Sequence, residues 1–92
     1  MVRIELTKTA SKQLRKVPRN VLTKLTMWAD SIRQIGLKET RKIPGYHDEP
    51  LKGNKKNRRS IRLNRQWRAE YFETVDDTGE VIIILEIHPH AY

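Results

Sequence analysis

The segment from Val81 to Ile87 constrains the fold more than any other part of the chain. Its sequence, VIIILEI, is almost continuously apolar and rich in β-branched residues. Such side chains favour extended backbone, and an unbroken apolar run is typical of a strand in the middle of a sheet, covered on both sides. We therefore expect a central strand close to the C-terminus.

The N-terminal residues show a different apolar period. Val2, Ile4 and Leu6 alternate with Arg3 and Glu5. This period of two is typical of a half-buried strand, because successive side chains of a strand point to opposite faces. We expect the first strand here.

The next segment changes to a helical period. Thr7 or Thr9 can cap a first helix that ends at Pro18, which lacks the N–H that a helix interior requires. A second helix follows, with Gly36 placed to end it. The apolar faces of the two helices are formed by Ala10, Leu14 and Val17, and by Val21, Leu22, Leu25, Trp28, Ala29, Ile32 and Ile35. The sequence thus predicts a helical hairpin, with Trp28 in the core.

The second half of the chain predicts a loop and three strands. Residues 37–58 contain a short turn near Leu37 to Arg41 and then a loop. Strands follow at Ser60–Leu63, at Gln66–Val75 and at Val81–Ile87, joined through Asn64-Arg65 and through the turn DDTG at 76–79. In the middle strand, the alternation places Trp67, Ala69 and Tyr71 on one face and Arg68, Glu70 and Phe72 on the other.

These elements predict an α+β fold in a single domain spanning residues 1–92. The order is strand, helix, helix and then three strands. We expect the helical hairpin to pack on one face of a mainly antiparallel four-stranded sheet and to leave the other face open. A chain of 92 residues is long enough for one such two-layer core.

The charge of the chain points to a polyanionic partner. From Glu49 to Arg68, with Arg68 included, there are eight Lys or Arg residues and no acidic residue after Glu49, and the formal net charge is +8. A cationic surface raises the local concentration of phosphate groups. We assign phosphate binding to Lys52, Lys55, Lys56, Arg58, Arg59, Arg62 and Arg65.

Other compositional features narrow the function further. The absence of cysteine excludes disulfides and thiolate chemistry. No segment has the roughly 20 consecutive apolar residues that a membrane span needs, and the N-terminus lacks the apolar region of a signal peptide, so we expect a cytoplasmic protein. Two histidines flanking Pro89 are too few ligands for a metal site, and we expect neither metal nor cofactor.

Several motifs, taken in order, resemble the RelE/ParE superfamily of toxins from bacterial type II toxin-antitoxin modules. They are EPLKG at 49–53, RSIRL at 59–63, WRAEY at 67–71 and a C-terminal His-x-Tyr. The resemblance covers nearly the whole chain. It implies one of two activities: RelE-like members cleave mRNA in the ribosomal A site, whereas ParE-like members inhibit DNA gyrase without catalysis. The EPLKG motif and the terminal His and Tyr are closer to the ribonucleases.

The resemblance also implies site residues and partners. By position, Glu49, Arg68, His90 and Tyr92 match the catalytic residues, with Lys52 and Arg62 as supporting cations. Because Ala91 separates His90 from Tyr92, either His88 or His90 can hold the histidine role. The implied partners are the ribosome with its mRNA and a cognate acidic antitoxin.

The chemistry can also be argued from the residues. RNA carries its own nucleophile, the 2′-OH, so a protein can cleave it without a metal by aligning that oxygen with the adjacent phosphorus. Glu49 is then the base, His90 the acid and Arg68 the phosphate clamp, while Tyr92 stacks on or orients a nucleobase.

Simpler interpretations of the same residues remain open. Glu49 is also compatible with a solvated turn, Arg68 with an ion pair to Glu70, and Trp67 with either the core or base stacking. His47 is a turn residue or an accessory catalytic group. The function has two alternatives, a gyrase inhibitor of the same fold and an RNA-binding module without catalysis.

Overall fold

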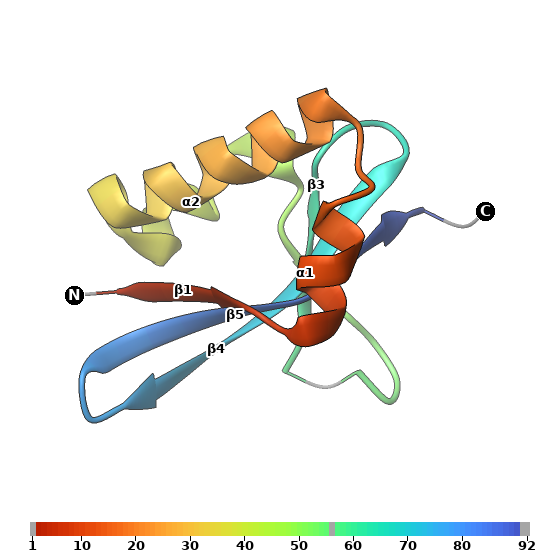
Figure 1. Cartoon of the computed structure of the whole chain (residues 1–92). Helices are drawn as coiled ribbons and strands as arrows, with labels where there is room; N and C mark the ends of the chain where they lie inside the picture. The colour runs from red at the N-terminus through yellow and green to blue at the C-terminus, as the bar shows by residue number, and fades with distance from the viewer. Residues whose placement is uncertain (1, 56, 91–92) are drawn as a thin grey trace.

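The computed structural model describes residues 2–55 and 57–90 (Figure 1). Its elements follow the predicted order, with one short strand and one short 3₁₀ helix added between the helices and the predicted strands. They are β1 (Arg3–Leu6), α1 (Lys8–Leu14), α2 (Arg19–Thr40), the 3₁₀ helix η1 (Pro44–Tyr46), β2 (Glu49–Pro50), β3 (Arg59–Arg62), β4 (Trp67–Asp76) and β5 (Gly79–Pro89).

Within the described residues, the strands form one five-stranded mixed sheet in the order β1-β5-β4-β3-β2. β1 runs parallel to β5, and the other neighbouring pairs are antiparallel. The prediction of a central C-terminal strand is confirmed, because β5 lies between β1 and β4. The predicted count of four strands is wrong: β2 pairs with β3 through two residues only, too few for any alternation to be visible in the sequence.

Both helices cover the same face of the sheet, as predicted for an α+β two-layer fold (Figure 1). The buried face of α2 consists of Val21, Leu25, Trp28 and Ile32, spaced by three and four residues. The rings of Trp28 and Tyr71 lie 4.9 Å apart between centroids, which joins α2 to β4 and confirms Trp28 as a core residue. The apolar stripe is narrower than predicted, because Leu22 and Ile35 are exposed.

The end of α1 differs from the prediction. α1 ends at Leu14 rather than near Val17, since residues 15–17 form a turn that leads into Pro18, the N-cap of α2. In α2, Gly36 breaks the helix with φ 86° and ψ 162°, and the short turn predicted after it is a further helical turn, Leu37 to Thr40. This extra turn brings Arg41 to the sheet, where it contacts Tyr71.

A β-bulge in β5 decides which of its side chains face the helices. Glu70 pairs with Glu86, but the next residue, Tyr71, pairs with Ile84, so Leu85 is an additional residue in β5. As a result Ile84 and Ile87 are both buried against the helices. Glu86 and His88 lie on the opposite, uncovered face. The predicted covering of both faces is therefore wrong, and Ile83 and Leu85 are only half-buried.

The turns that join the last strands are fixed by side chains. Between β3 and β4, Asn64 Oδ1 accepts hydrogen bonds from the backbone of Gln66 and Trp67, each at 2.8 Å. Between β4 and β5, Asp76 Oδ1 accepts from the backbone N–H of Thr78 at 2.8 Å, as the turn motif predicted. None of the helices in the described segments is long and apolar enough to cross a membrane.

Candidate active site

Two rows of side chains cross the uncovered face of the sheet. Residues that are directly opposite in neighbouring strands share a face. The first row contains Glu49, Ser60, Glu70 and Glu86, from β2, β3, β4 and β5 respectively. The second row contains Arg62, Arg68 and His88. The register thus brings together residues that are up to 39 positions apart in the sequence, Glu49 and His88.

Except for Glu86, the residues of these rows line a cavity of about 330 Å³. Its lining contains most of the predicted catalytic residues that fall in the described part of the chain. The lining residues are His47, Glu49, Leu51, Ser60, Arg62, Arg68, Glu70, His88 and His90. A cavity of this size suits a small polar group or a single nucleotide. Tyr92 and Lys56, which were also predicted as site residues, lie outside the described residues.

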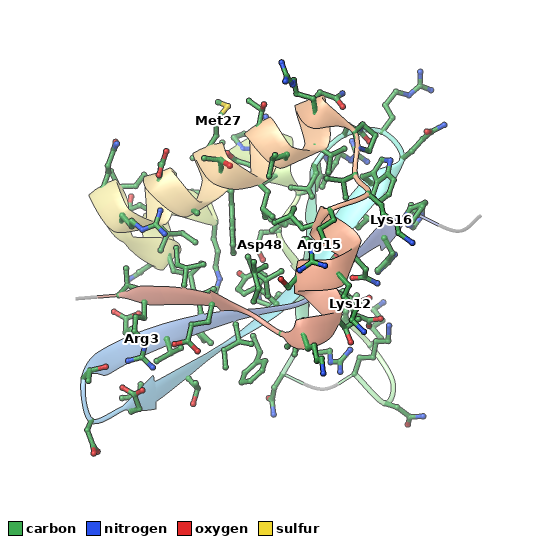
Figure 2. All side chains as sticks on the ribbon, viewed as in Figure 1. Arg3, Lys12, Arg15, Lys16, Met27 and Asp48 are labelled. Atoms are coloured by element: carbon green, nitrogen blue, oxygen red, sulfur yellow. The ribbon has the colours of Figure 1, made fainter. Side chains whose placement is uncertain are left out.

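Glu49 reaches the cavity because the residues before it are held firmly. His47 has left-handed backbone, φ 44° and ψ 50°, which reverses the chain after η1. Asp48 then points into the interior between α2 and the sheet (Figure 2), and its side chain is fully buried. It accepts hydrogen bonds from Arg59 Nε at 2.5 Å and from the Tyr71 hydroxyl at 2.6 Å.

The contacts of Asp48 continue into a buried polar network. Arg41 Nε donates to the Tyr71 hydroxyl at 3.3 Å, and Arg41 Nη2 forms an ion pair with Glu73 at 2.7 Å. Burial raises the pKa of Tyr71 above its ordinary value, and Asp48 raises it further, so the hydroxyl remains a donor. No local pattern in the sequence connects Asp48 with Tyr71, 23 residues later, so this network was not predicted.

The Lys and Arg residues that follow Glu49 fall into three groups: some line the cavity, some are exposed and some form ion pairs with acidic residues of the protein. Arg62 and Arg68 line the cavity. Arg68 Nη1 donates to the carbonyls of Asn64 at 2.8 Å and Trp67 at 3.0 Å, which fixes the guanidinium beside the β3–β4 turn. Arg62 Nε is buried without a hydrogen-bond partner among the described residues.

The other basic residues lie outside the cavity. Lys52 and Arg65 are exposed. Lys55 and Arg58 form ion pairs with Glu70, at 3.1 and 3.2 Å, and Arg59 is bound to Asp48. Acidic residues of the protein itself therefore bind part of the predicted phosphate-binding set.

Glu70 is the buried acidic residue of the cavity. From the sequence it was considered only as an ion-pair partner for Arg68. Its side chain is 4% exposed, and its Oε2 lies 2.7 Å from His88 Nε2. Burial alone raises the pKa of Glu70, but the hydrogen bonds from His88, Lys55 and Arg58 outweigh it and hold the pKa below its ordinary value. Glu70 is therefore ionised at neutral pH.

The second histidine, His90, directly follows the last residue of β5. His90 lines the cavity, and its backbone N–H donates to the carbonyl of Gln66, which fastens the end of β5 to the β3–β4 turn. Among residues 2–55 and 57–90, no group of three or more potential ligands is arranged to hold a metal ion. The side chains that the cavity does bring together supply two carboxylates, two guanidinium groups and three imidazoles.

Comparison with known proteins gives a consistent result for the fold. No protein-family model and no curated protein matches the sequence. Solved structures do match: a YoeB/ParE toxin from Agrobacterium tumefaciens has a TM-score of 0.69 at 18% identity, covering 97% of this chain and 99% of that one. A YoeB–YefM complex from Staphylococcus aureus has a TM-score of 0.70 at 22% identity, covering 99% of both chains.

A third match comes from an archaeon. The RelE–RelB complex from Pyrococcus horikoshii has a TM-score of 0.67 at 21% identity, covering 96% of this chain and 93% of that one. The similarity extends over the full length in each case, while the sequence identity stays low. The resemblance to the RelE/ParE toxins is thus confirmed in three dimensions, and the chain has the fold of these toxins.

Proposed function

We propose that the protein is the toxin of a type II toxin-antitoxin module and that it cleaves translated mRNA on the ribosome. The observation that carries this proposal is the cavity on the uncovered face, where Glu49, Arg68, His88 and His90 line one space. An acid, a base and a clamp for phosphate are the groups that RNA cleavage through the 2′-OH requires.

The reaction follows from these groups. Glu49 accepts the proton of the 2′-OH while the 2′ oxygen attacks the adjacent phosphorus. The new bond joins the 2′ oxygen to phosphorus, and the bond from phosphorus to the 5′ oxygen breaks. One of the two C-terminal histidines, His88 or His90, donates a proton to the departing 5′ oxygen. The products are a 2′,3′-cyclic phosphate and a 5′-hydroxyl, and the chemistry proceeds without a metal.

The guanidinium groups stabilise the charge that accumulates on the phosphate. Arg68 is held at the cavity wall by carbonyl groups, and Arg62 lines the same cavity. Preorganised donors of this kind act without reorganising when the charge develops. Removing Arg68 is expected to lower the rate of cleavage by about 10² to 10³.

The ribosome is the expected scaffold for substrate binding. A cavity of about 330 Å³ holds no more than a nucleotide, so it cannot read a long RNA sequence by itself. The exposed cations, such as Lys52 and Arg65, would contact ribosomal RNA and mRNA around it.

A cognate acidic antitoxin is the second expected partner. On the helical side, an apolar groove of about 210 Å³ lies between α2 and β1, and β1 is an edge strand of the sheet. The lining residues of this groove are Ile4, Leu6, Leu14, Leu22, Leu25, Thr26, Ala29, Arg33 and Ile84. An amphipathic helix or an added strand of an antitoxin would bury this surface.

Mapping of 5′ ends in a reporter mRNA after brief expression tests the proposal. We expect cuts inside the translated frame, in phase with codons, for the wild type. Arg68→Ala should lose them, whereas Arg19→Ala, which removes an exposed arginine at the start of α2, should keep them. DNA damage without mRNA cuts would instead indicate gyrase inhibition, and protection of RNA without cuts would indicate a binding module.

A further inference from the structure

Glu70 is a buried carboxylate to which the catalytic scheme above gives no role. Its side chain is 4% exposed and lies in the wall of the cavity. Burial of a charged group is costly unless it is paired, so a carboxylate at this position needs a specific partner. The shortest contact of Glu70 is with His88, at 2.7 Å, while its contacts with Lys55 and Arg58 exceed 3 Å.

The imidazole of His88 has an acceptor at each nitrogen. Nε2 faces Glu70 Oε2, and Nδ1 lies 3.0 Å from the carbonyl oxygen of Pro89. A carbonyl oxygen and an ionised carboxylate can only accept hydrogen bonds. The doubly protonated ring is therefore the form that satisfies both contacts.

The charged groups around His88 differ in sign and distance. On β4, Arg68 lies directly opposite His88 and opposes protonation of the ring, whereas Glu70 favours it. His47, Glu49, Arg62 and His90 line the same cavity. Arg58 connects Glu70 to Glu86, at 3.2 and 3.4 Å. Behind the strand, α1 packs on the other face of β5, where Gln13 Oε1 accepts from the backbone of Ile87.

We propose that Glu70 is a positioning residue that orients His88 and keeps it protonated, so that His88 is the general acid of the reaction. This inference rests on the ribonuclease function proposed above. His88 Nε2 keeps its proton on Glu70, as the carboxylate of a catalytic triad holds its histidine. Nδ1 releases its proton to the departing 5′ oxygen, because its present acceptor, the exposed carbonyl of Pro89, is easily replaced. The ring is then neutral and regains a proton from water.

A purely structural role for Glu70 makes a different prediction. If the carboxylate serves only to anchor the loop through Lys55 and Arg58, its replacement should weaken RNA binding or stability without changing the pH dependence of cleavage. If it holds the proton on His88, its replacement should move the pH dependence. The pH profile therefore separates the two roles.

The experiment compares Glu70→Gln with a matched carboxylate replacement, Glu86→Gln. Glu86 lies beside Glu70 in the same row and also binds Arg58, but it is 37% exposed. Single-turnover cleavage of mRNA on programmed ribosomes is measured across the pH range. We expect the alkaline limb of the rate profile to move about one to three pH units lower in Glu70→Gln and to stay unchanged in Glu86→Gln.

Ring ¹⁵N NMR of the full-length protein provides a readout that does not depend on cleavage. The His88 ring should be doubly protonated at neutral pH in the wild type and should lose its proton at a lower pH in Glu70→Gln. Equal titration of the ring in both proteins would overturn the coupling between Glu70 and His88, even if cleavage persisted.

Two histidine variants complete the test. His88→Ala should lower the rate by about 10² to 10⁴, more than His90→Ala does. The reverse order would show that His90 is the acid and would overturn the role of His88 while leaving the proposed function intact. A wild-type protein that fails to cut programmed mRNA would overturn the proposed function itself and the catalytic role of His88 with it.

Discussion

At the scale of single residues, Asp48 connects the core to the cavity. Its buried carboxylate accepts from Arg59 and Tyr71, and the next residue, Glu49, lines the cavity. Packing of the core and placement of the proposed base are therefore coupled through one side chain. A change in the core next to Asp48 should therefore alter the position of Glu49.

Replacement of Tyr71 by Phe tests this coupling. The ring remains in contact with Trp28, but one oxygen of buried Asp48 loses its donor. We expect the free energy of unfolding in urea to fall by about 1 to 3 kcal/mol. Tyr46→Phe removes a hydroxyl from another buried ring and gives the cost of such a change for comparison. Equal losses in the two variants would contradict a special role for the Asp48 contact.

Glu70 makes the stability dependent on pH in a defined direction. Its pKa is lower in the folded protein than its ordinary value of 4.5. The stabilisation from its ionised form is therefore fully present above about pH 4.5 and is lost as the pH falls through the lowered folded value. We expect the difference in unfolding free energy between the wild type and Glu70→Gln to shrink between pH 5 and pH 2. A difference that grows on acidification would show that the pKa is raised instead.

At the scale of elements, the break in α2 at Gly36 directs the chain toward the sheet. Its backbone, φ 86° and ψ 162°, lies in a region that is essentially restricted to glycine. A Cβ added there would meet nothing within 4 Å, so the cost of a side chain would come from the backbone alone.

Gly36→Ala is accordingly expected to lower the free energy of unfolding by about 1 to 3 kcal/mol. Gly45→Ala is the matched control, because Gly45 also has open space around it but no positive φ. We expect this control to change stability by no more than about 1 kcal/mol in either direction. Thermal or urea unfolding of both variants measures the loss of unfolding free energy. Similar losses at the two positions would indicate that a side chain at Gly36 does not strain the backbone.

The elements also show what local patterns can and cannot predict. The helical stripe of α2, the turn at Asp76 and the faces of β4 follow from spacing and turn chemistry, and the structure confirms them. The bulge at Leu85 does not follow, because it has no glycine or proline to mark it and depends on pairing with Tyr71. Since the bulge places His88 on the uncovered face, the assembly of the cavity required the three-dimensional register.

For a related reason, only some of the residues that line the cavity could be predicted from the sequence. Glu49, Arg68 and the two histidines were found through a motif that extends over the chain. Glu70 was not identified, because its burial and its contact with His88 arise between strands that are 18 residues apart at this point. Sequence spacing carries no information about such a cross-strand contact.

At the scale of the whole molecule, positive charge lies on more than one side. Lys12, Arg15 and Lys16 project from α1 and the turn after it (Figure 2), and all are exposed. On the cavity side, Lys55 and Arg58 form ion pairs with buried Glu70, and on the helical side Arg59 binds buried Asp48, so fewer cations can meet phosphate. The net charge of +8 therefore overstates the contact that RNA makes at the cavity.

The salt dependence of RNA binding measures how many cations take part. Contact with about five phosphates of a single strand predicts a slope near −3.5 for log K against log salt concentration, because each contact contributes about −0.7 through counterion release. Fluorescence anisotropy with a short single-stranded RNA gives this slope. Lys52→Ala, at an exposed position beside the cavity, should make it shallower by about 0.7. Lys38→Ala, at the end of α2, should leave it nearly unchanged, since this lysine belongs to the helical layer. A wild-type slope shallower than about −1.5, or equal effects of the two variants, would mean that RNA does not dock on the cavity side through these cations.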